Sequence, residues 1–205
     1  YFWGPYRTLA DESGHKLATF NMFNAAGRLD VDDLDRVLGD CVAEQGCALV
    51  ILNTPCHNPT GYSMDQGEWD QVVEVVARRG AAHPITVLLD VAYGSYQPAG
   101  FELCLKNLAR LSQHALVLFA WSASKSFLQY GLRVGALVAV VEDDDERARI
   151  ANAMTYSCRG TWSNCNAGGM TAITEVLTDP GLRARATAER AELAAMLTRR
   201  VNLWN

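Results

Sequence analysis

The sequence lacks a long hydrophobic segment and an excess of basic residues. In 205 residues, no stretch approaches the roughly 18 uncharged apolar residues that suggest a membrane span. No basic start followed by an apolar run indicates a signal peptide. Lys and Arg total 18 against 23 Asp and Glu, a net charge of −5, which argues against a protein that binds nucleic acid by neutralising phosphates. We therefore expect neither a membrane nor a nucleic acid as a partner.

Clustered cysteines are also missing. The six cysteines are scattered, with no C-x-x-C motif and no histidine at zinc-finger spacing. This favours free or buried thiols in a reducing cytoplasm over a disulfide scaffold, and a metal site is the minor alternative. We expect no metal. The cysteines are Cys41, Cys47, Cys56, Cys104, Cys158 and Cys165.

Strand and helix patterns alternate along the chain, whose hydrophobic fraction of 49% is enough to build a core. Ser63 and Gln66 have the spacing of a capping box at one helix start. No repeat or linker interrupts the pattern, so we expect one domain over residues 1–205. The alternation predicts an α/β fold with a mostly parallel sheet flanked by helices. Strands are expected over 16–24, 47–53 (buried on both faces), 85–89, 115–120 and 135–141, and helices over 30–38, 63–80, 101–112, 143–156, 164–178 and from 180 onward.

Polar side chains follow three of the predicted strands, where ligands bind in open α/β sheets. Taken singly, each has a structural explanation: Asn58-Pro59 suits a turn, Asp90 suits a helix cap, and Lys125 suits a solvated surface. Taken together, they place an amide, a carboxylate, a phenol, hydroxyls and two cations at strand ends. The residues are Asn58, Asp90, Tyr93, Ser122, Ser124, Lys125 and, eight residues beyond the lysine, Arg133.

This set of groups suits an aldehyde cofactor that carries a phosphate. A lysine amine condenses with an aldehyde, while hydroxyls and an arginine fork hold a phosphate. A carboxylate facing a pyridine nitrogen keeps that nitrogen protonated. Protonation makes pyridoxal 5′-phosphate (PLP) an electron sink, so PLP is the expected cofactor.

The sequence resembles the class I aminotransferases of the PLP fold-type I superfamily, in the aspartate/aromatic aminotransferase branch. The matching segments agree in order and spacing, and the match runs from Trp3 nearly to the end of the chain. They are His57–Gly61, Asp90–Tyr93, Ser122–Phe127 and Tyr130–Gly135.

The resemblance implies a role for each site residue. Lys125 would be the catalytic residue, joined to PLP as a Schiff base and transferring a proton. Asp90 would pair with the pyridine nitrogen, and Tyr6 stands where many relatives have a histidine beside that aspartate. Trp3 would stack on the pyridine ring, although a simple core tryptophan is the alternative. The remaining implied roles are hydrogen bonds to the ring oxygen from Asn58 and Tyr93, and phosphate binding by Ser122, Ser124 and Arg133.

The resemblance also implies that the chain is incomplete. Family members are longer, with a glycine-containing phosphate loop upstream and a carboxylate-binding arginine downstream. The sequence starts without Met, and we expect a large PLP-binding domain truncated at both ends, without the small domain and the N-terminal part. The full-length form is expected to be a homodimer, and this chain alone is expected to have little transaminase activity.

The implied reaction is amino-group transfer from an amino acid to a 2-oxo acid. Aspartate-type relatives place an arginine three residues before a Tyr-Ser pair, where this sequence has Ala153. We therefore expect an aromatic or neutral amino acid to be preferred, unless Arg159 replaces the missing charge. Trp162 would line an apolar pocket or be structural. The alternatives are another PLP reaction such as a carbon–sulfur lyase, and an aminotransferase-like sensor domain of a transcription regulator.

Overall fold

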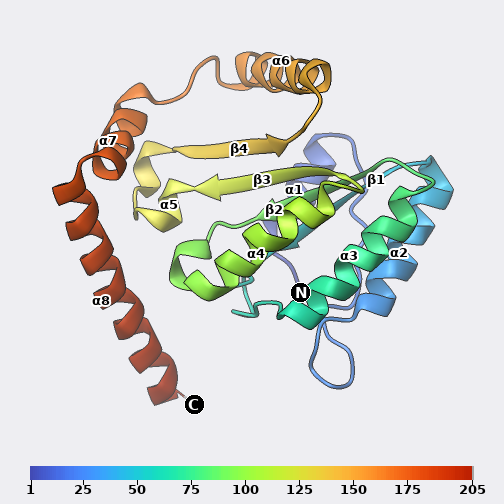
Figure 1. Ribbon diagram of the computed structural model, residues 1–205, viewed down its shortest axis with the longest axis horizontal. Coiled ribbons are helices and arrows are strands. Elements are labelled where there is room, and N and C mark those ends of the chain that lie inside the picture. Colours follow the sequence, from blue (N-terminus) through green and yellow to red (C-terminus); the bar gives the residue numbers. More distant parts are fainter. Residues whose placement is uncertain (205) are drawn as a thin grey trace. The chain divides into compact units, whose positions relative to one another are not determined.

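The structure, a computed structural model, describes residues 1–204, whose contacts divide them into two compact units. The first unit comprises Tyr1–Trp121 and Ala136–Ala153. The second comprises Ser122–Gly135 and the residues from Met154 onward. The fold is α/β with a mostly parallel sheet flanked by helices, as the sequence predicts (Figure 1).

The sheet has the strand order β1-β2-β3-β4. Strands β1 (Ala48–Asn53), β2 (Ile85–Asp90) and β3 (Leu116–Ser122) are parallel, and β4 (Gly135–Val140) runs opposite to β3 (Figure 1). The register pairs Asn53 with Asp90, so the carboxyl ends of β1 and β2 coincide. The polar residues Asn53 and Asp90 therefore lie next to each other at the carboxyl end of the sheet.

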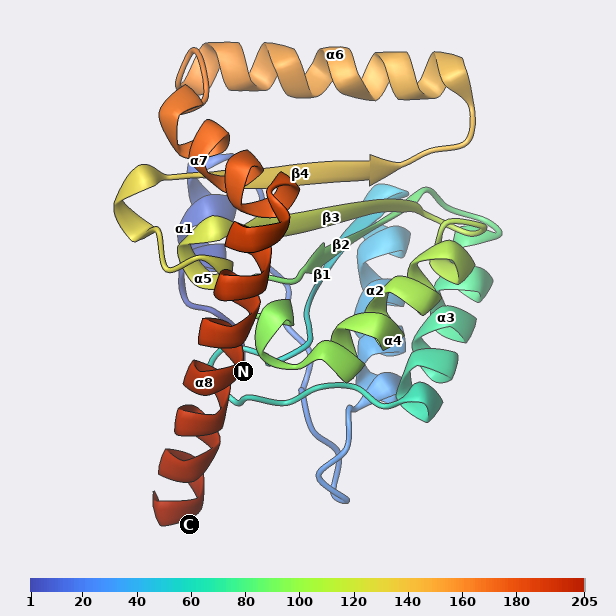
Figure 2. The ribbon, with the colours of Figure 1, turned by 60° about the vertical axis from the view of Figure 1, so that its left-hand side comes forward.

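Three helices lie side by side and cover one face of this sheet: α2 (Val31–Gln45), α3 (Gln66–Gly80) and α4 (Pro98–Leu111) (Figures 1 and 2). On α3 the apolar residues recur at helical spacing, so Trp69, Val72 and Val76 share one buried stripe. These side chains pack with alternate residues of β2, of which Val87 and Leu89 are fully buried.

The first unit also contains the short helices α1 (Pro5–Glu12) and η1 (Gly94–Tyr96). Helix α6 (Asp144–Thr161) follows β4, and its residues up to Ala153 belong to the first unit. In the second unit, the short helices α5 (Ala123–Ser126) and η2 (Tyr130–Leu132) contact each other, and α7 (Ala167–Thr178) packs on α8 (Pro180–Trp204). In the part of the chain that is described, no helix is both long and apolar enough to cross a membrane.

Three local predictions were wrong. Residues 16–24 form no strand, because the Asn24 side chain accepts hydrogen bonds from the backbone N–H groups of Ala26 and Arg28 and bends the chain. The capping box at α3 is formed by Asp65 and Glu68 rather than by Ser63 and Gln66. Strand β1 is buried on one face only, with Leu49 58% exposed on the other.

Candidate active site

Asp90 ends β2 with hydrogen bonds to both carboxylate oxygens. Tyr6 donates its phenol proton to Oδ2 at 2.5 Å, and the backbone N–H of Ala92 donates to Oδ1 at 3.1 Å. The side chain of Asn53 donates to the Asp90 carbonyl at 2.9 Å across the β1–β2 pair. The carboxylate is therefore held in one orientation at the carboxyl end of the sheet, where a ligand is expected.

Asn53 also holds the loop that carries Asn58. Its side-chain oxygen accepts a hydrogen bond from the Asn58 backbone N–H at 2.6 Å. One amide thus connects Asn58 and Asp90, which lie on different segments. Asn53 was not among the predicted site residues, although a polar residue at the end of an apolar strand is a usable signal.

His57 precedes Asn58 and is buried. Its Nδ1 lies 2.9 Å from the Thr60 hydroxyl oxygen. Burial is the main cause that lowers the pKa of His57, and the charge of Asp90 opposes this shift. His57 is therefore mainly neutral at neutral pH, and its contact with Thr60 helps to fix the loop that holds Asn58.

Tyr93 follows Asp90 by three residues and lies half-buried just before η1. Its ring lies 6.4 Å from that of Tyr96. The turn needs glycine at position 94, because a Cβ there would approach the Phe101 ring to 2.5 Å. The close packing of α4 against this turn determines where Tyr93 lies.

Trp3 is 40% exposed and is not part of the buried core. Its ring packs edge-on against Tyr6, with ring centroids 5.4 Å apart. Because Tyr6 donates to Asp90, this contact connects Trp3 to the carboxylate. An exposed aromatic ring beside a polar strand end is available to a planar ligand.

In the second unit, two short turns place Arg133 beside Ser124, and Lys125 follows Ser124 on the same helix. Ser124 and Lys125 lie on α5 and Arg133 directly follows η2. Arg133 donates from Nη1 to the Ser124 hydroxyl at 3.3 Å and to the Tyr130 carbonyl at 2.9 Å. A guanidinium beside a hydroxyl is a donor pair suited to a phosphate.

Lys125 itself contacts Tyr130. The amine donates to the Tyr130 hydroxyl at 2.8 Å and lies 4.2 Å from the centre of that ring. Ser122 ends β3 half-buried. The hydroxyl of Ser126 is buried and has no hydrogen-bond partner within the described residues. This hydroxyl is therefore available to form a hydrogen bond with a ligand. Tyr130 was missed as a site residue, because no helical or strand period relates it to Lys125.

Arg133 adopts a left-handed backbone conformation, with φ of 51°. Such a conformation is uncommon for residues other than glycine, and it costs on the order of 1 kcal/mol or more. The backbone hydrogen bond from Ala123 to Val134 at 3.1 Å ties the next residue to the start of α5. The turn therefore positions the guanidinium beside Ser124 at the expense of backbone strain.

The predicted residues thus fall into two groups. Trp3, Asn58, Asp90 and Tyr93 belong to the first unit. Ser122, Ser124, Lys125 and Arg133 belong to the second. Among the described residues, no cluster of three or more His, Cys, Asp or Glu side chains is placed to hold a metal ion.

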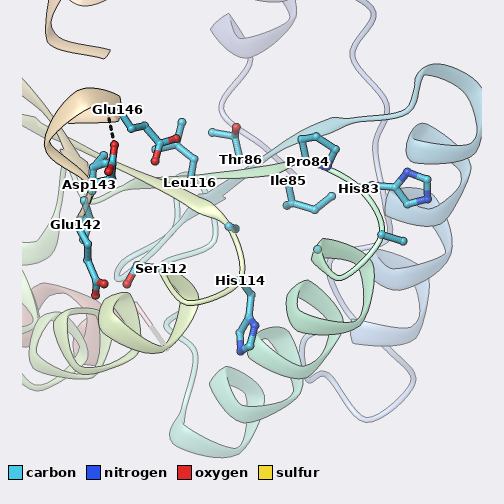
Figure 3. A pocket seen from close by; sticks show the side chains of 15 residues that line it. His83, Pro84, Ile85, Thr86, Ser112, His114, Leu116, Glu142, Asp143 and Glu146 are labelled. Atoms are coloured by element: carbon cyan, nitrogen blue, oxygen red, sulfur yellow. Dashed lines mark hydrogen bonds between the residues drawn. The ribbon is translucent and has the colours of Figure 1, made fainter. Parts of the chain in front are cut away.

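A separate groove of about 770 Å³ lies in the first unit (Figure 3). It opens at the amino ends of β2 and β3, the end of β2 opposite to Asp90. Its rim includes Asp143, whose Oδ1 accepts a hydrogen bond from the Glu146 backbone at 2.7 Å. None of the predicted site residues lines this groove.

The sequence matches the family described as Aminotransferase class I and II over residues 1–203. The chain therefore belongs to the class I and II aminotransferases.

The chain is similar to curated relatives of two kinds. It is 32% identical over 194 residues to an aspartate aminotransferase of Pseudomonas aeruginosa, covering 93% of this chain and 46% of that protein. It is 29% identical over 195 residues to an aromatic-amino-acid aminotransferase of Escherichia coli, covering 93% and 47%. The chain spans about half the length of these relatives.

Solved structures show the same likeness. An aminotransferase from Anaerococcus prevotii has a TM-score of 0.89 and 26% identity, covering 98% of this chain and 50% of that one. An aromatic-amino-acid aminotransferase from Burkholderia pseudomallei has a TM-score of 0.80 and 30% identity, covering 95% and 47%. The Burkholderia protein is covalently bound to pyridoxal phosphate.

Proposed function

We propose that this chain carries the cofactor-binding part of a PLP-dependent aminotransferase that transfers an amino group from an amino acid to a 2-oxo acid. The observation that carries the proposal is one short segment in which the Arg133 guanidinium donates to the Ser124 hydroxyl and the next residue, Lys125, holds its amine against the Tyr130 hydroxyl. Family membership and a PLP-bound relative support the same conclusion.

The residues present fit PLP by their donor chemistry. Arg133 and Ser124, with Ser122, would bind the phosphate, since their polar atoms are donors. Asp90 accepts on both oxygens and is suited to a protonated ring nitrogen. Asn58 and Tyr93 would donate to the ring oxygen, and Trp3 would stack on the ring.

PLP, when bound, supplies an electron sink for negative charge at the substrate α-carbon. The chain's own residues bind and orient the reactants and move a proton. The Nζ of Lys125 would take the proton from the substrate α-carbon and deliver it to the cofactor carbon C4′. Tyr130 orients that amine through its hydroxyl, 2.8 Å from Nζ. Asp90 would pair with the ring nitrogen and favour its protonated form.

Labelling tests the assignment of Lys125. Borohydride reduction of the full-length, PLP-loaded protein should attach the cofactor irreversibly to one lysine, and peptide mass spectrometry should find it on Lys125. The other lysines of this segment, Lys16 and Lys106, serve as internal controls. A label on either of them would show the assignment to be wrong. The Lys125→Ala variant should lose turnover, because both the Schiff base and the proton carrier are removed.

We propose that an aromatic or neutral amino acid is preferred over aspartate. Ala153 lies on α6 and offers no charge for a second substrate carboxylate. Arg159 donates to the Ser163 hydroxyl at 2.7 Å, which occupies one of its guanidinium nitrogens. Trp162 is 62% exposed and provides an apolar surface instead.

Steady-state kinetics of the full-length enzyme test this preference. The kcat/KM for tyrosine or phenylalanine should exceed that for aspartate by about tenfold or more, since removing one partner of a desolvated charge pair costs at least ~2 kcal/mol. Arg159→Ala should leave the aromatic substrates nearly unaffected. A clear preference for aspartate that Arg159→Ala abolishes would instead assign the carboxylate contact to Arg159.

We also propose a cytoplasmic homodimer for the full-length form. All six cysteines are free thiols, as expected in a reducing compartment. Tyr156 and Trp162 are largely exposed aromatic residues, a type that is enriched where proteins associate. Sedimentation of the full-length protein should give twice the mass of one chain, and a monomer would contradict the dimer.

A further inference from the structure

The contact between Tyr6 and Asp90 joins residues 84 positions apart, from α1 to the end of β2. Each oxygen of the Asp90 carboxylate accepts from one neutral donor, the Tyr6 phenol at Oδ2 and the Ala92 N–H at Oδ1. Neither donor carries a charge, so the carboxylate remains available to a cation.

Two contacts with Trp3 hold Tyr6 in place. Its backbone N–H donates to the Trp3 carbonyl at 3.0 Å, and the Trp3 ring packs edge-on against it. Burial raises the pKa of the Tyr6 phenol most strongly, and the charge of Asp90 and the hydrogen bond raise it further. The phenol is therefore a proton donor across the working pH range.

We propose that Tyr6 is a positioning residue that orients the Asp90 carboxylate through a hydrogen bond that persists over the working pH range. The inference rests on the proposed function, in which Asp90 pairs with the cofactor's ring nitrogen. A phenol titrates near pH 10 in water, whereas an imidazole in its place would titrate near pH 6.5.

His57, on the loop after β1, is a further ionisable group whose pKa responds to the charge of Asp90. Its pKa is lowered chiefly by burial. Its Nδ1 is engaged with Thr60, so His57 is mainly neutral above about pH 6.5. Titration of His57 is therefore not expected to change the Asp90 hydrogen bond above that pH.

The test compares the full-length wild type with Tyr6→Phe and Tyr6→His. The dissociation constant for PLP is measured on the apoprotein between pH 6 and pH 9, together with the visible absorption of bound PLP. Tyr6→Phe should weaken PLP binding by about tenfold, because one hydrogen bond to a charged group is lost. The ratio of its dissociation constant to that of the wild type should not change with pH.

Tyr6→His should behave differently. Protonated imidazole is the stronger donor, so the ratio should be close to one at pH 6 and should rise by about threefold or more towards pH 9. Tyr62→Phe is the matched control, because it also removes a phenol–carboxylate hydrogen bond, there to Glu68, without touching Asp90. It should leave PLP affinity and absorption unchanged.

Three results would decide the matter. A wild type that binds no PLP would overturn the proposed function and this inference with it. PLP binding by the wild type with an unchanged affinity and absorption spectrum in Tyr6→Phe would overturn only the role of Tyr6. If Tyr6→Phe does not fold, Tyr6→His decides alone, and a ratio that does not vary with pH would overturn the inference.

Discussion

Arg133 has a left-handed backbone conformation and donates a hydrogen bond to Ser124, and we predict that its guanidinium binds the cofactor phosphate. We expect Arg133→Ala to raise the dissociation constant for PLP by roughly 10- to 100-fold, since hydrogen bonds to charged groups contribute about 1.5–3 kcal/mol. Fluorescence titration of the full-length apoprotein measures this. Arg133→Lys keeps the charge without the fork.

Arg133→Lys should therefore lose less affinity than Arg133→Ala, but should not match the wild type. Pyridoxal without its phosphate provides the second control, because its affinity should respond little to either substitution. An equal loss of affinity for pyridoxal and for PLP in Arg133→Ala would contradict phosphate binding by this residue.

At the residue scale, the sequence predicts the types of group in the site better than their partners. The order of Ser124, Lys125 and Arg133 in the sequence predicts a shared site, and the two turns place Arg133 against Ser124, while the binding roles of all three stay predictions. Asn53 and Tyr130 were not predicted. Each acts through a contact that depends on strand register or on a turn, and neither leaves a periodic pattern in the sequence.

At the scale of elements, Glu68 organises the start of α3. It is 4% exposed, and its carboxylate accepts from Leu29 N–H at 2.8 Å, from Asp65 N–H at 2.9 Å, from Arg28 Nε at 3.1 Å and from the Tyr62 hydroxyl. These partners connect the bend at 24–29 and the end of the Asn58 loop to one helix. A buried charge with this many donors is well satisfied.

We expect Glu68→Gln to lower the free energy of unfolding by about 2–3 kcal/mol. The amide has one acceptor oxygen in place of two and directs an N–H₂ group at donors, so buried donors lose their partner. Urea denaturation of the full-length protein measures the change. Glu74→Gln, on the exposed side of the same helix, should change stability by less than about 0.5 kcal/mol. Similar effects of both variants would contradict the organising role of Glu68.

The helices and strands were largely predictable from sequence because their patterns are periodic. Apolar residues at helical spacing predicted α3, and short apolar runs predicted β1, β2 and β3. Residues 16–24 were predicted wrongly, since Phe20 and Met22 pack individually on the core while the backbone turns at Asn24. Alternation of apolar and polar residues indicates which side chains are buried. A segment can bury alternate side chains without forming a strand.

At the scale of the whole molecule, binding of PLP should increase the stability of the folded state. A ligand that binds only the folded state stabilises it by about 2.7 kcal/mol at a hundred times its dissociation constant. PLP should therefore raise the melting temperature of the full-length protein. Pyridoxal at the same concentration should raise it less, because it lacks the group that Arg133 and Ser124 bind. Equal stabilisation by both compounds would contradict the assignment of the phosphate site.

The hydrogen bond from Tyr6 to Asp90 also constrains the order in which the chain folds. It closes a loop of 84 residues, whereas the Asn53–Asp90 contact closes one of 37. The longer closure costs about 0.7 kcal/mol more chain entropy, from the logarithmic dependence on loop length. Contacts between distant residues form slowly, so we expect the carboxylate to acquire its phenol donor after β1 and β2 have paired. The test follows refolding of the full-length protein by tryptophan fluorescence, with Trp3→Phe to separate the signal of Trp3 from that of the other tryptophans; a Trp3 signal that changes before the strands pair would contradict this order.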